Sequence, residues 1–306
     1  MDSRVKILID NIEQIIVGKT EVIKLVITAM IARGHVLIED VPGVGKTQMV
    51  ASLANSCAGI FNRVQLTPDI MPSDITGFSL LNKKSGEMEF KKGAAFCNFL
   101  LADEINRSSP KTQSALLEVM EEEQVSLDGN TYELPKPFMV LATQNPVETY
   151  GTYHLPEAQM DRFIMKISVG YPSRDNELAI LRRDRIMSPD MLSQVLSTSD
   201  IMNLCKEADN VTCSEAVENY ILDIVLSTRH SEGIRLGVSP RGSLALRRCA
   251  KAHALVEGRD YCIPDDVKLL APFVLSHRIQ LSPKGKAMWD NNENAIVSIL
   301  AGIRVV

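Results

Sequence analysis

The sequence predicts an α/β core built on a parallel sheet, followed by a helical region. Short apolar runs alternate with helical patterns in the first half of the 306-residue chain, which is typical of strands joined by crossover helices. After Gly170-Tyr171-Pro172 the pattern becomes helical almost throughout. With 45% hydrophobic and 23% charged residues, the composition is that of an ordinary globular protein, and the length is ample for two domains.

Five apolar runs are predicted to be strands covered on both faces, because they lack regular polar alternation. They span residues 35–39, 63–66, 98–102, 138–142 and 163–168. Helices are predicted in the amphipathic segment 1–19, at 47–56 and at 110–122. Two further segments predict β-hairpins that project from the core: 77–93, around a Ser85-Gly86 turn, and 124–134, around Asp128-Gly129.

The second half predicts helices at 176–184, 199–208, 214–228, 243–257 and 265–276. Pro264 followed by two aspartates is typical of a helix start, since acids in the first turn complement the helix dipole. We therefore expect two domains, a core of residues 1–171 with two inserted hairpins and a helical domain of residues 172–306.

Net charge, cysteine spacing and hydropathy disfavour several classes of protein. The net charge of −5 disfavours sequence-independent nucleic-acid binding, which depends on basic surface. None of the six cysteines forms a C-x-x-C pair, which predicts reduced and mostly buried thiols. The charged N-terminal segment does not resemble a signal peptide, and no run has the length of a membrane span. These features predict a cytoplasmic protein.

The segment EDVPGVGKT, residues 39–47, predicts a loop that binds phosphate. An apolar strand precedes it and a helix follows it, which is the context that such a loop requires. The N–H groups of residues 43–47 would face an anion at the helix N-terminus, Lys46 would neutralise phosphate charge, and Thr47 would bind Mg²⁺. Asp40 replaces the usual first glycine, and we expect its carboxylate to face away from the phosphates.

Polar side chains follow two other predicted strands. Asp103 and Glu104 end the apolar run NFLLADE, where we expect Asp103 to hold Mg²⁺ and Glu104 to polarise the attacking water. Asn145 follows FMVLATQ and is expected to orient the water or contact the γ-phosphate; a plain turn before Pro146 is the alternative.

Together these segments resemble the MoxR family of AAA+ ATPases over nearly the whole chain. The resemblance rests on EDVPGVGKT, LTPDIMPSDITG, LLADEINRSSPKTQSALLEVMEE, ATQNP and LPEAQMDRF. It implies an AAA+ P-loop core of αβα layers followed by an all-α helical lid domain. Since the family includes PGxGKT loops without the first glycine, it also implies that Asp40 is a family variation and that the loop works.

The resemblance implies a role for each matching residue. Asp103 and Glu104 match the Walker B pair, and Asn145 matches sensor 1. Arg162 matches the arginine finger, for which a buried ion pair with Glu157 or Asp161 is the alternative, and Arg241 matches sensor 2 in the lid. The segment that packs against adenine matches Val17 and Gly18, where an ordinary helix end is the alternative. The Walker A loop, with its nucleotide contacts, matches Pro42, Gly43, Val44, Gly45, Lys46, Thr47 and Gln48.

The function implied is Mg²⁺-dependent ATP hydrolysis at subunit interfaces of a homo-oligomeric ring, with six subunits as the AAA+ default. It would drive chaperone-like remodelling, assembly or metal insertion of a client protein, with a von Willebrand factor A domain protein as a separate partner. Both hairpins resemble family elements that face the pore and touch substrate. The alternatives are a nucleic-acid translocase and a metal-chelatase-type motor subunit. A GTPase lacks support because no N-K-x-D follows a core strand, and a non-hydrolysing scaffold ranks low because all the catalytic residue types are present.

Overall fold

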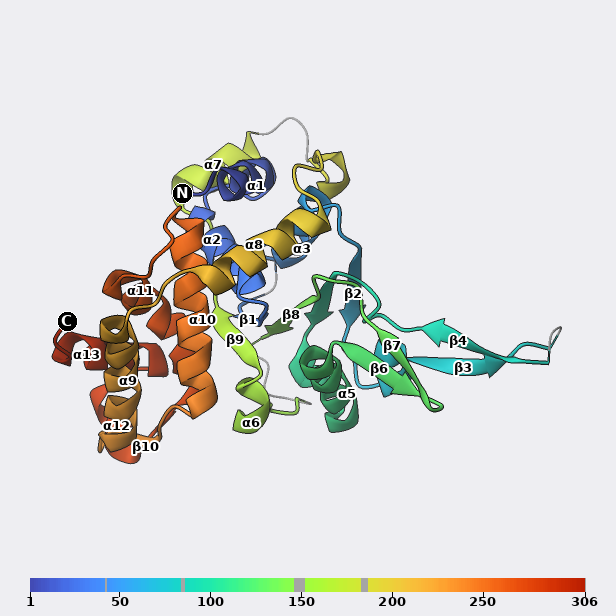
Figure 1. The fold of residues 1–306 in the computed structure, drawn as a ribbon. Coiled ribbons are helices and arrows are strands. Elements are labelled where there is room, and N and C mark those ends of the chain that lie inside the picture. The colour runs from blue at the N-terminus through green and yellow to red at the C-terminus, as the bar shows by residue number, and fades with distance from the viewer. Residues whose placement is uncertain (42, 84–85, 146–151, 183–186, 306) are drawn as a thin grey trace.

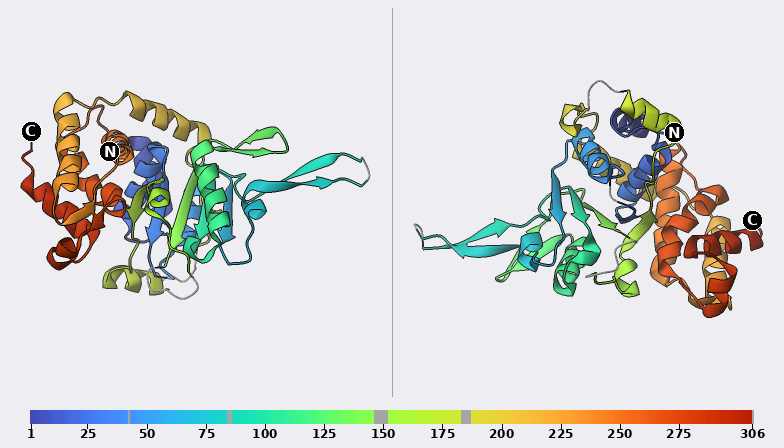
Figure 2. Two further views of the ribbon diagram at one scale, coloured as in Figure 1. Left: turned by 90° about the horizontal axis from the view of Figure 1, so that it is seen from below. Right: turned by 180° about the vertical axis from the view of Figure 1, so that it is seen from behind.

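The computed structural model describes residues 1–305, apart from residue 42 and the segments 84–85, 146–151 and 183–186 (Figure 1). The described part divides visibly into a sheet with its flanking helices, a pair of projecting hairpins and a group of C-terminal helices (Figures 1 and 2).

Five parallel strands form the central sheet, in the order β2-β5-β8-β1-β9. Their bounds are β1 His35–Glu39, β2 Phe61–Gln65, β5 Phe99–Asp103, β8 Met139–Gln144 and β9 Phe163–Ile167. All five predicted strands are confirmed, with ends shifted by at most two residues. Because the strands are parallel, their carboxyl ends meet at one edge of the sheet and their amino ends at the opposite edge.

Alternate side chains of the inner strands belong to two different cores. In β1, Val36 and Ile38 join the core on one face, whereas Leu37 joins the core on the other. The first face is covered by α1 (Ser3–Glu13), α2 (Thr20–Ile31) and α3 (Lys46–Ser56), and the second by α4 (Pro72–Thr76) and α5 (Pro110–Glu122). Covering both faces explains why these strands read as continuous apolar runs.

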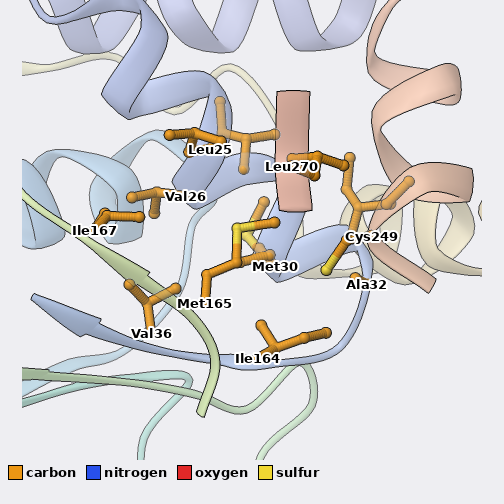
Figure 3. Packing of buried hydrophobic residues seen from close by; sticks show 14 of the residues in the cluster. Leu25, Val26, Met30, Ala32, Val36, Ile164, Met165, Ile167, Cys249 and Leu270 are labelled. Atoms are coloured by element: carbon orange, nitrogen blue, oxygen red, sulfur yellow. The ribbon is translucent and has the colours of Figure 1, made fainter. Parts of the chain in front are cut away.

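Helix α2 was not predicted from the sequence. Eight of its twelve residues are buried, so it lacks the polar stripe that marks an amphipathic helix. Figure 3 shows the reason: Leu25 and Met30 of α2 pack in one buried cluster with Met165 of β9 and with Cys249 and Leu270 of the C-terminal helices. One continuous core therefore joins the sheet to the helical part.

A buried histidine connects the amino end of the sheet to α5. His35 is 6% exposed; its Nε2 lies 2.8 Å from the carbonyl oxygen of Met120, and its Nδ1 accepts a 2.9 Å hydrogen bond from the N–H of Val140. The accepting Nδ1 makes Nε2 the protonated nitrogen of a neutral ring. Burial lowers the pKa of His35 to about 4.

Both predicted hairpins are confirmed as two-stranded antiparallel ribbons that project side by side (Figures 1 and 2). The first consists of β3 (Gly77–Leu81) and β4 (Met88–Lys92), and the second of β6 (Gln124–Leu127) and β7 (Asn130–Glu133). Ser85 of the expected first turn lies outside the described residues. The second turn has positive φ at Asp128 and Gly129, as the sequence predicts. The rings of Phe90 and Tyr132 stack with centroids 4.1 Å apart and so connect the two hairpins.

The C-terminal part contains the five predicted helices and a small sheet that the sequence did not predict. The helices are α7 (Arg174–Leu181), α8 (Thr198–Asn210), α9 (Glu215–His230), α10 (Pro240–Val256) and α11 (Pro264–Leu275). Two short helices, α12 (Pro283–Met288) and α13 (Asn292–Gly302), follow them, and α6 (Glu157–Met160) precedes β9. Strands β10 (Ile234–Leu236) and β11 (Gln280–Leu281) pair antiparallel between the helices; both are shorter than the runs that sequence patterns detect.

The predicted domain boundary near Pro172 remains a prediction, although α7 begins just after it. None of the helices in the described ranges combines the length and the hydropathy that a bilayer span requires.

Candidate active site

The loop between β1 and α3 forms a cradle of backbone N–H groups. Gly43 and Gly45 have φ of 88° and 84°, a region that side chains rarely adopt, so both positions favour glycine. Gly45 is the N-cap of α3, so the first N–H groups of that helix face the loop. Lys46 Nζ donates to the carbonyl oxygens of Asp40 and Val41, at 3.3 Å each, and therefore lies over the loop. Pro42, predicted to contact nucleotide, lies outside the described residues.

Asp40 fastens the start of this loop to the end of β9. One carboxylate oxygen accepts hydrogen bonds from the N–H groups of Val169 (2.6 Å) and Gly170 (2.7 Å) and from the hydroxyl of Ser168 (3.2 Å). The other accepts from the N–H of Val41 at 3.0 Å. The carboxylate thus points toward residues 168–170, which the sequence did not predict; the sequence predicted only that it faces away from the phosphates. Asp40 replaces the usual glycine with a side chain that has its own structural partners.

The loop that follows β1 and residues of β2, β5 and β8 near their carboxyl ends surround one cavity of about 440 Å³. Every residue that lines it belongs to the loop, to the start of α3 or to the end of a strand. The lining residues are Gly43, Gly45, Lys46, Thr47, Gln48, Arg63, Gln65, Asp103, Glu104, Thr143 and Asn145. The structure therefore brings together the predicted phosphate loop, both predicted acids and Asn145, although the sequence separates the first from the last by about a hundred residues.

A short hydrogen-bonded chain fixes the two acids. The hydroxyl of Thr143 donates to Asp103 at 2.6 Å and accepts from the N–H of Glu104 at 2.9 Å. Arg63 pairs with the other oxygen of Asp103 at 2.7 Å, and Arg107 pairs with Glu104 at 2.8 Å. Glu104 has φ 56° and ψ 53°, a left-handed conformation that is strained for a residue with a side chain and that recurs at functional sites.

Sequence reasoning missed Arg63, Thr143 and Arg107 as parts of this site. A signal existed for Arg63, because it is a basic residue within a predicted strand. It lies two positions before Gln65, which is opposite Asp103 in the sheet. No signal marked Thr143, because a buried threonine in an apolar strand is usual.

The donor set at the cavity fits a magnesium ion bound together with phosphate. Thr47 and Asp103 present a hydroxyl and a carboxylate, the hard oxygen ligands that Mg²⁺ prefers. In the part of the chain that the structure describes, no three His, Cys, Asp or Glu side chains form a metal-binding group. Magnesium would therefore depend on phosphate oxygens and water for its other ligands, which is its usual mode in nucleotide sites.

The segment predicted to contact adenine lies next to the phosphate loop. Ile16 Cδ1 is 4.0 Å from the position that a Cβ on Gly45 would take. Gly18 has φ 67° and packs against the side chain of Asn176 in α7, so a Cβ there would collide with it. Val17 is half-buried. The adenine contact of Val17 and Gly18 stays a prediction.

The two predicted arginines lie far from this cavity in their own chain. Arg162 directly precedes β9, whereas the phosphate loop follows the neighbouring parallel strand β1. A five-residue strand is about 16 Å long, so Arg162 lies roughly that far from the loop, at the amino edge of the sheet. Arg162 pairs with Glu121 at 2.8 Å and donates to the carbonyl oxygen of Leu117 at 2.7 Å. The partner is thus Glu121 of α5 and not Glu157 or Asp161.

Arg241 belongs to the same cluster. It pairs with the other oxygen of Glu121 at 2.5 Å, so one glutamate holds both arginines. Arg241 therefore lies beside Arg162 near the end of α5, and its role as sensor 2 stays a prediction. The carboxylate of Asp161, the residue before Arg162, pairs with Arg278 at 2.6 Å and accepts a hydrogen bond from the hydroxyl of Ser239 at 3.1 Å. Both partners belong to the C-terminal helical part. Packing of the C-terminal helices therefore fixes where Arg162 lies.

Comparison with known proteins places the chain in a family. Residues 35–165 match the model of the ATPase family associated with various cellular activities, and residues 226–299 match the AAA lid domain. The chain is 49% identical to YeaC of Bacillus subtilis, covering 97% of this chain and 93% of YeaC. It is 44% identical to Chaperone MoxR1 of Mycobacterium tuberculosis, covering 89% of this chain and 74% of that protein.

A solved structure agrees with these relatives. The crystal structure of a proposed ATPase from Cytophaga hutchinsonii superimposes with a TM-score of 0.91 at 40% identity, covering 99% of this chain and 95% of the other. The TM-score shows that the two chains share one fold over nearly their whole lengths. The chain belongs to the MoxR family of AAA+ ATPases.

Proposed function

We propose that the chain hydrolyses ATP with Mg²⁺ at sites completed between subunits of a homo-oligomeric ring, and that hydrolysis remodels a partner protein. The observation that carries this proposal is the single cavity shared by the phosphate loop, Asp103, Glu104 and Asn145. Phosphate-binding N–H groups, two carboxylates and an amide around one cavity are the groups that phosphoryl transfer to water requires.

Each residue at the cavity has a proposed task. The N–H groups of the loop and Lys46 hold the β- and γ-phosphates. Thr47 and Asp103 would hold magnesium, which would supply positive charge against the charge that develops on the phosphate. Glu104 orients the attacking water, and Asn145 fixes its position relative to the γ-phosphate. The hydroxyl of Thr143 keeps the two acids in place.

The position of Arg162 supports a site shared between chains. A cation that stabilises the transferred phosphoryl group must contact it, and the strand length separates Arg162 from its own loop by about 16 Å. Arg162 is 30% exposed at the side chain and Arg241 is 48% exposed, so both are accessible to a neighbouring subunit. We propose that both arginines face the nucleotide of the next subunit, with Glu121 holding them in position.

The remodelling part of the proposal is supported by the hairpins and by one relative. The printed name of the relative from Mycobacterium tuberculosis is Chaperone MoxR1. The ribbon of β3 and β4 extends far from the body and exposes Phe78, Leu80 and Met88, which offers an apolar surface to an unfolded segment (Figure 1). We propose a six-membered ring and a separate partner with a von Willebrand factor A domain, with assembly or metal insertion as the outcome for the client.

The first test is ATP turnover per protomer against protein concentration with Mg²⁺ present. A shared site predicts a rate that rises steeply and then saturates, because an arginine finger contributes on the order of 10³–10⁵ in rate. A rate that does not depend on concentration would refute the shared site. Absence of turnover at every concentration, even with single-stranded DNA or a partner added, would refute hydrolysis.

A mixing experiment tests the assignment of Arg162 directly. Glu104→Gln and Arg162→Ala are each expected to abolish turnover, and an equal mixture is expected to recover part of it. Recovery follows because an Arg162→Ala subunit keeps an intact Glu104 and receives Arg162 from its neighbour. Arg235→Ala is the matched control, since Arg235 is an exposed lid arginine that bonds to Gln280. No recovery in mixed rings of normal size would contradict the proposal.

A further inference from the structure

Two thiols of the helical part lie side by side, away from the proposed nucleotide site. Thr212 and Tyr261 form a parallel β-bridge, with the N–H of Thr212 bonded to the carbonyl of Asp260 (2.8 Å) and the N–H of Cys262 bonded to the carbonyl of Thr212 (2.9 Å). The next residue on each segment is a cysteine, Cys213 and Cys262 respectively. In a parallel pair, residues one step beyond a bridge lie opposite each other with side chains on the same face.

This geometry matches the requirements of a disulfide bond. Neighbouring strands lie about 4.8 Å apart, and a disulfide joins Cα atoms that are roughly 4.4–6.8 Å apart. The two thiols are close enough that each shifts the pKa of the other, downward for Cys213 and upward for Cys262. Cys262 is 6% exposed and Cys213 is half-buried, so Cys213 is the accessible member of the pair. Within the described residues no third metal ligand joins them, which disfavours a zinc site.

Cys213 differs chemically from the other cysteines. The hydrogen bond from the Cys262 thiol lowers the pKa of Cys213 to about 7, and Arg247 and Lys251 act in the same direction, whereas partial burial and Glu218 oppose it. Burial instead raises the pKa of the remaining thiols, those of Cys57, Cys97, Cys205 and Cys249. Since the thiolate is the reactive form, Cys213 is the thiol most ready to be oxidised at neutral pH.

We infer that Cys213 and Cys262 form a redox-sensitive pair that a peroxide converts into a disulfide. The Cys213 thiolate attacks one oxygen of hydrogen peroxide, the O–O bond breaks, and a sulfenic acid and hydroxide form. The Cys262 thiol then attacks the Cys213 sulfur, the S–O bond breaks, and a disulfide and water result. The bond connects the segments that enter α9 and α11, so oxidation ties these two lid helices together and a thiol reductant releases them.

Peptide mapping of the full chain tests this inference without any variant. Reduced protein is treated with hydrogen peroxide, alkylated in denaturant and digested without reductant. We expect one cross-linked peptide pair, containing Cys213 and Cys262 and lighter by two hydrogen atoms, that a dithiol reverses. The other thiols are expected to remain alkylated, and the oxidised protein is expected to have a higher Tm because the bond restricts the unfolded chain.

Variants then separate the role of Cys213, which peroxide oxidises first, from that of Cys262, which then forms the disulfide. In Cys262→Ser, dimedone is expected to trap a sulfenic acid at Cys213; in Cys213→Ser, Cys262 is expected to stay alkylated and the Tm unchanged by peroxide. Cys205→Ser, which removes a buried thiol of the same region, is the matched control and is expected to form the cross-link normally. The inference is overturned if wild-type Cys213 stays reduced while other thiols oxidise, or if it proceeds to sulfinic acid without joining Cys262.

Discussion

Replacing Asp40 by glycine separates what the motif suggests from what the structure predicts. The change restores the usual first glycine of a phosphate loop, so the motif alone suggests a neutral or favourable effect. The structure predicts a loss of stability, because the Asp40 carboxylate fastens the loop to Val169 and Gly170 at the end of β9. Asp40 is 7% exposed, so water cannot readily replace it as the acceptor.

The expected loss follows from these hydrogen bonds. Each bond to a charged group contributes about 1.5–3 kcal/mol, and the N–H groups of Val169 and Gly170 both lose their acceptor. Glycine also lowers stability by roughly 0.5–1 kcal/mol through backbone entropy. Asp40→Gly should therefore reduce the free energy of unfolding by on the order of 4 kcal/mol. Asp40→Asn, which keeps one acceptor oxygen but not the charge, should lose about half of that.

Urea unfolding followed by circular dichroism measures this difference. The matched control is Ser168→Ala, which removes only the longer 3.2 Å bond to the same carboxylate and should cost about 1 kcal/mol. A midpoint for Asp40→Gly equal to that of Ser168→Ala, at unchanged urea dependence, would refute the anchoring role. A midpoint above that of the wild type would mean that the motif, and not the contacts, governs this position.

Three further predictions concern the core, the lid and the hairpins. Lowering the pH from about 6.5 toward 4 should destabilise the sheet by on the order of 3 kcal/mol, because burial lowers the pKa of His35 to about 4 and the unfolded chain takes up the proton first. The urea midpoint of His35→Gln should fall less steeply over this pH range than that of the wild type; part of the slope remains because burial also lowers the pKa of His277. Arg259→Met should lower the free energy of unfolding by about 3 kcal/mol, because the Asp266 carboxylate, 2% exposed, loses the guanidinium that pairs with it. A Tm within a degree of that of the wild type would contradict this. Tyr132→Ala should speed amide hydrogen exchange in β4, because it removes the ring that stacks on Phe90. A double-mutant cycle between Tyr132 and Phe90 should give a coupling energy of about 1 kcal/mol, and additive effects of the two substitutions would show that the hairpins are independent.

Local sequence was sufficient where structure and chemistry both depend on neighbouring residues. The strands of the sheet follow from apolar runs, and the phosphate loop follows from its glycines and the helix behind it. Asp103 and Glu104 could be placed because they end a strand of the same parallel sheet. Helix α2 and the small sheet of β10 and β11 were missed because burial on most sides, or a length of two or three residues, removes periodicity.

The sequence by itself determined the family, the phosphate loop and the acids, since these depend on short segments whose residue types must meet fixed chemical needs. Only the tertiary structure decided that Glu121 holds Arg162 and Arg241 together, that Asp40 bonds to Gly170, and that two distant cysteines lie side by side. Such contacts join residues that are from 41 to 130 positions apart. They are set by how helices pack on the sheet, and no local pattern of side chains carries that information.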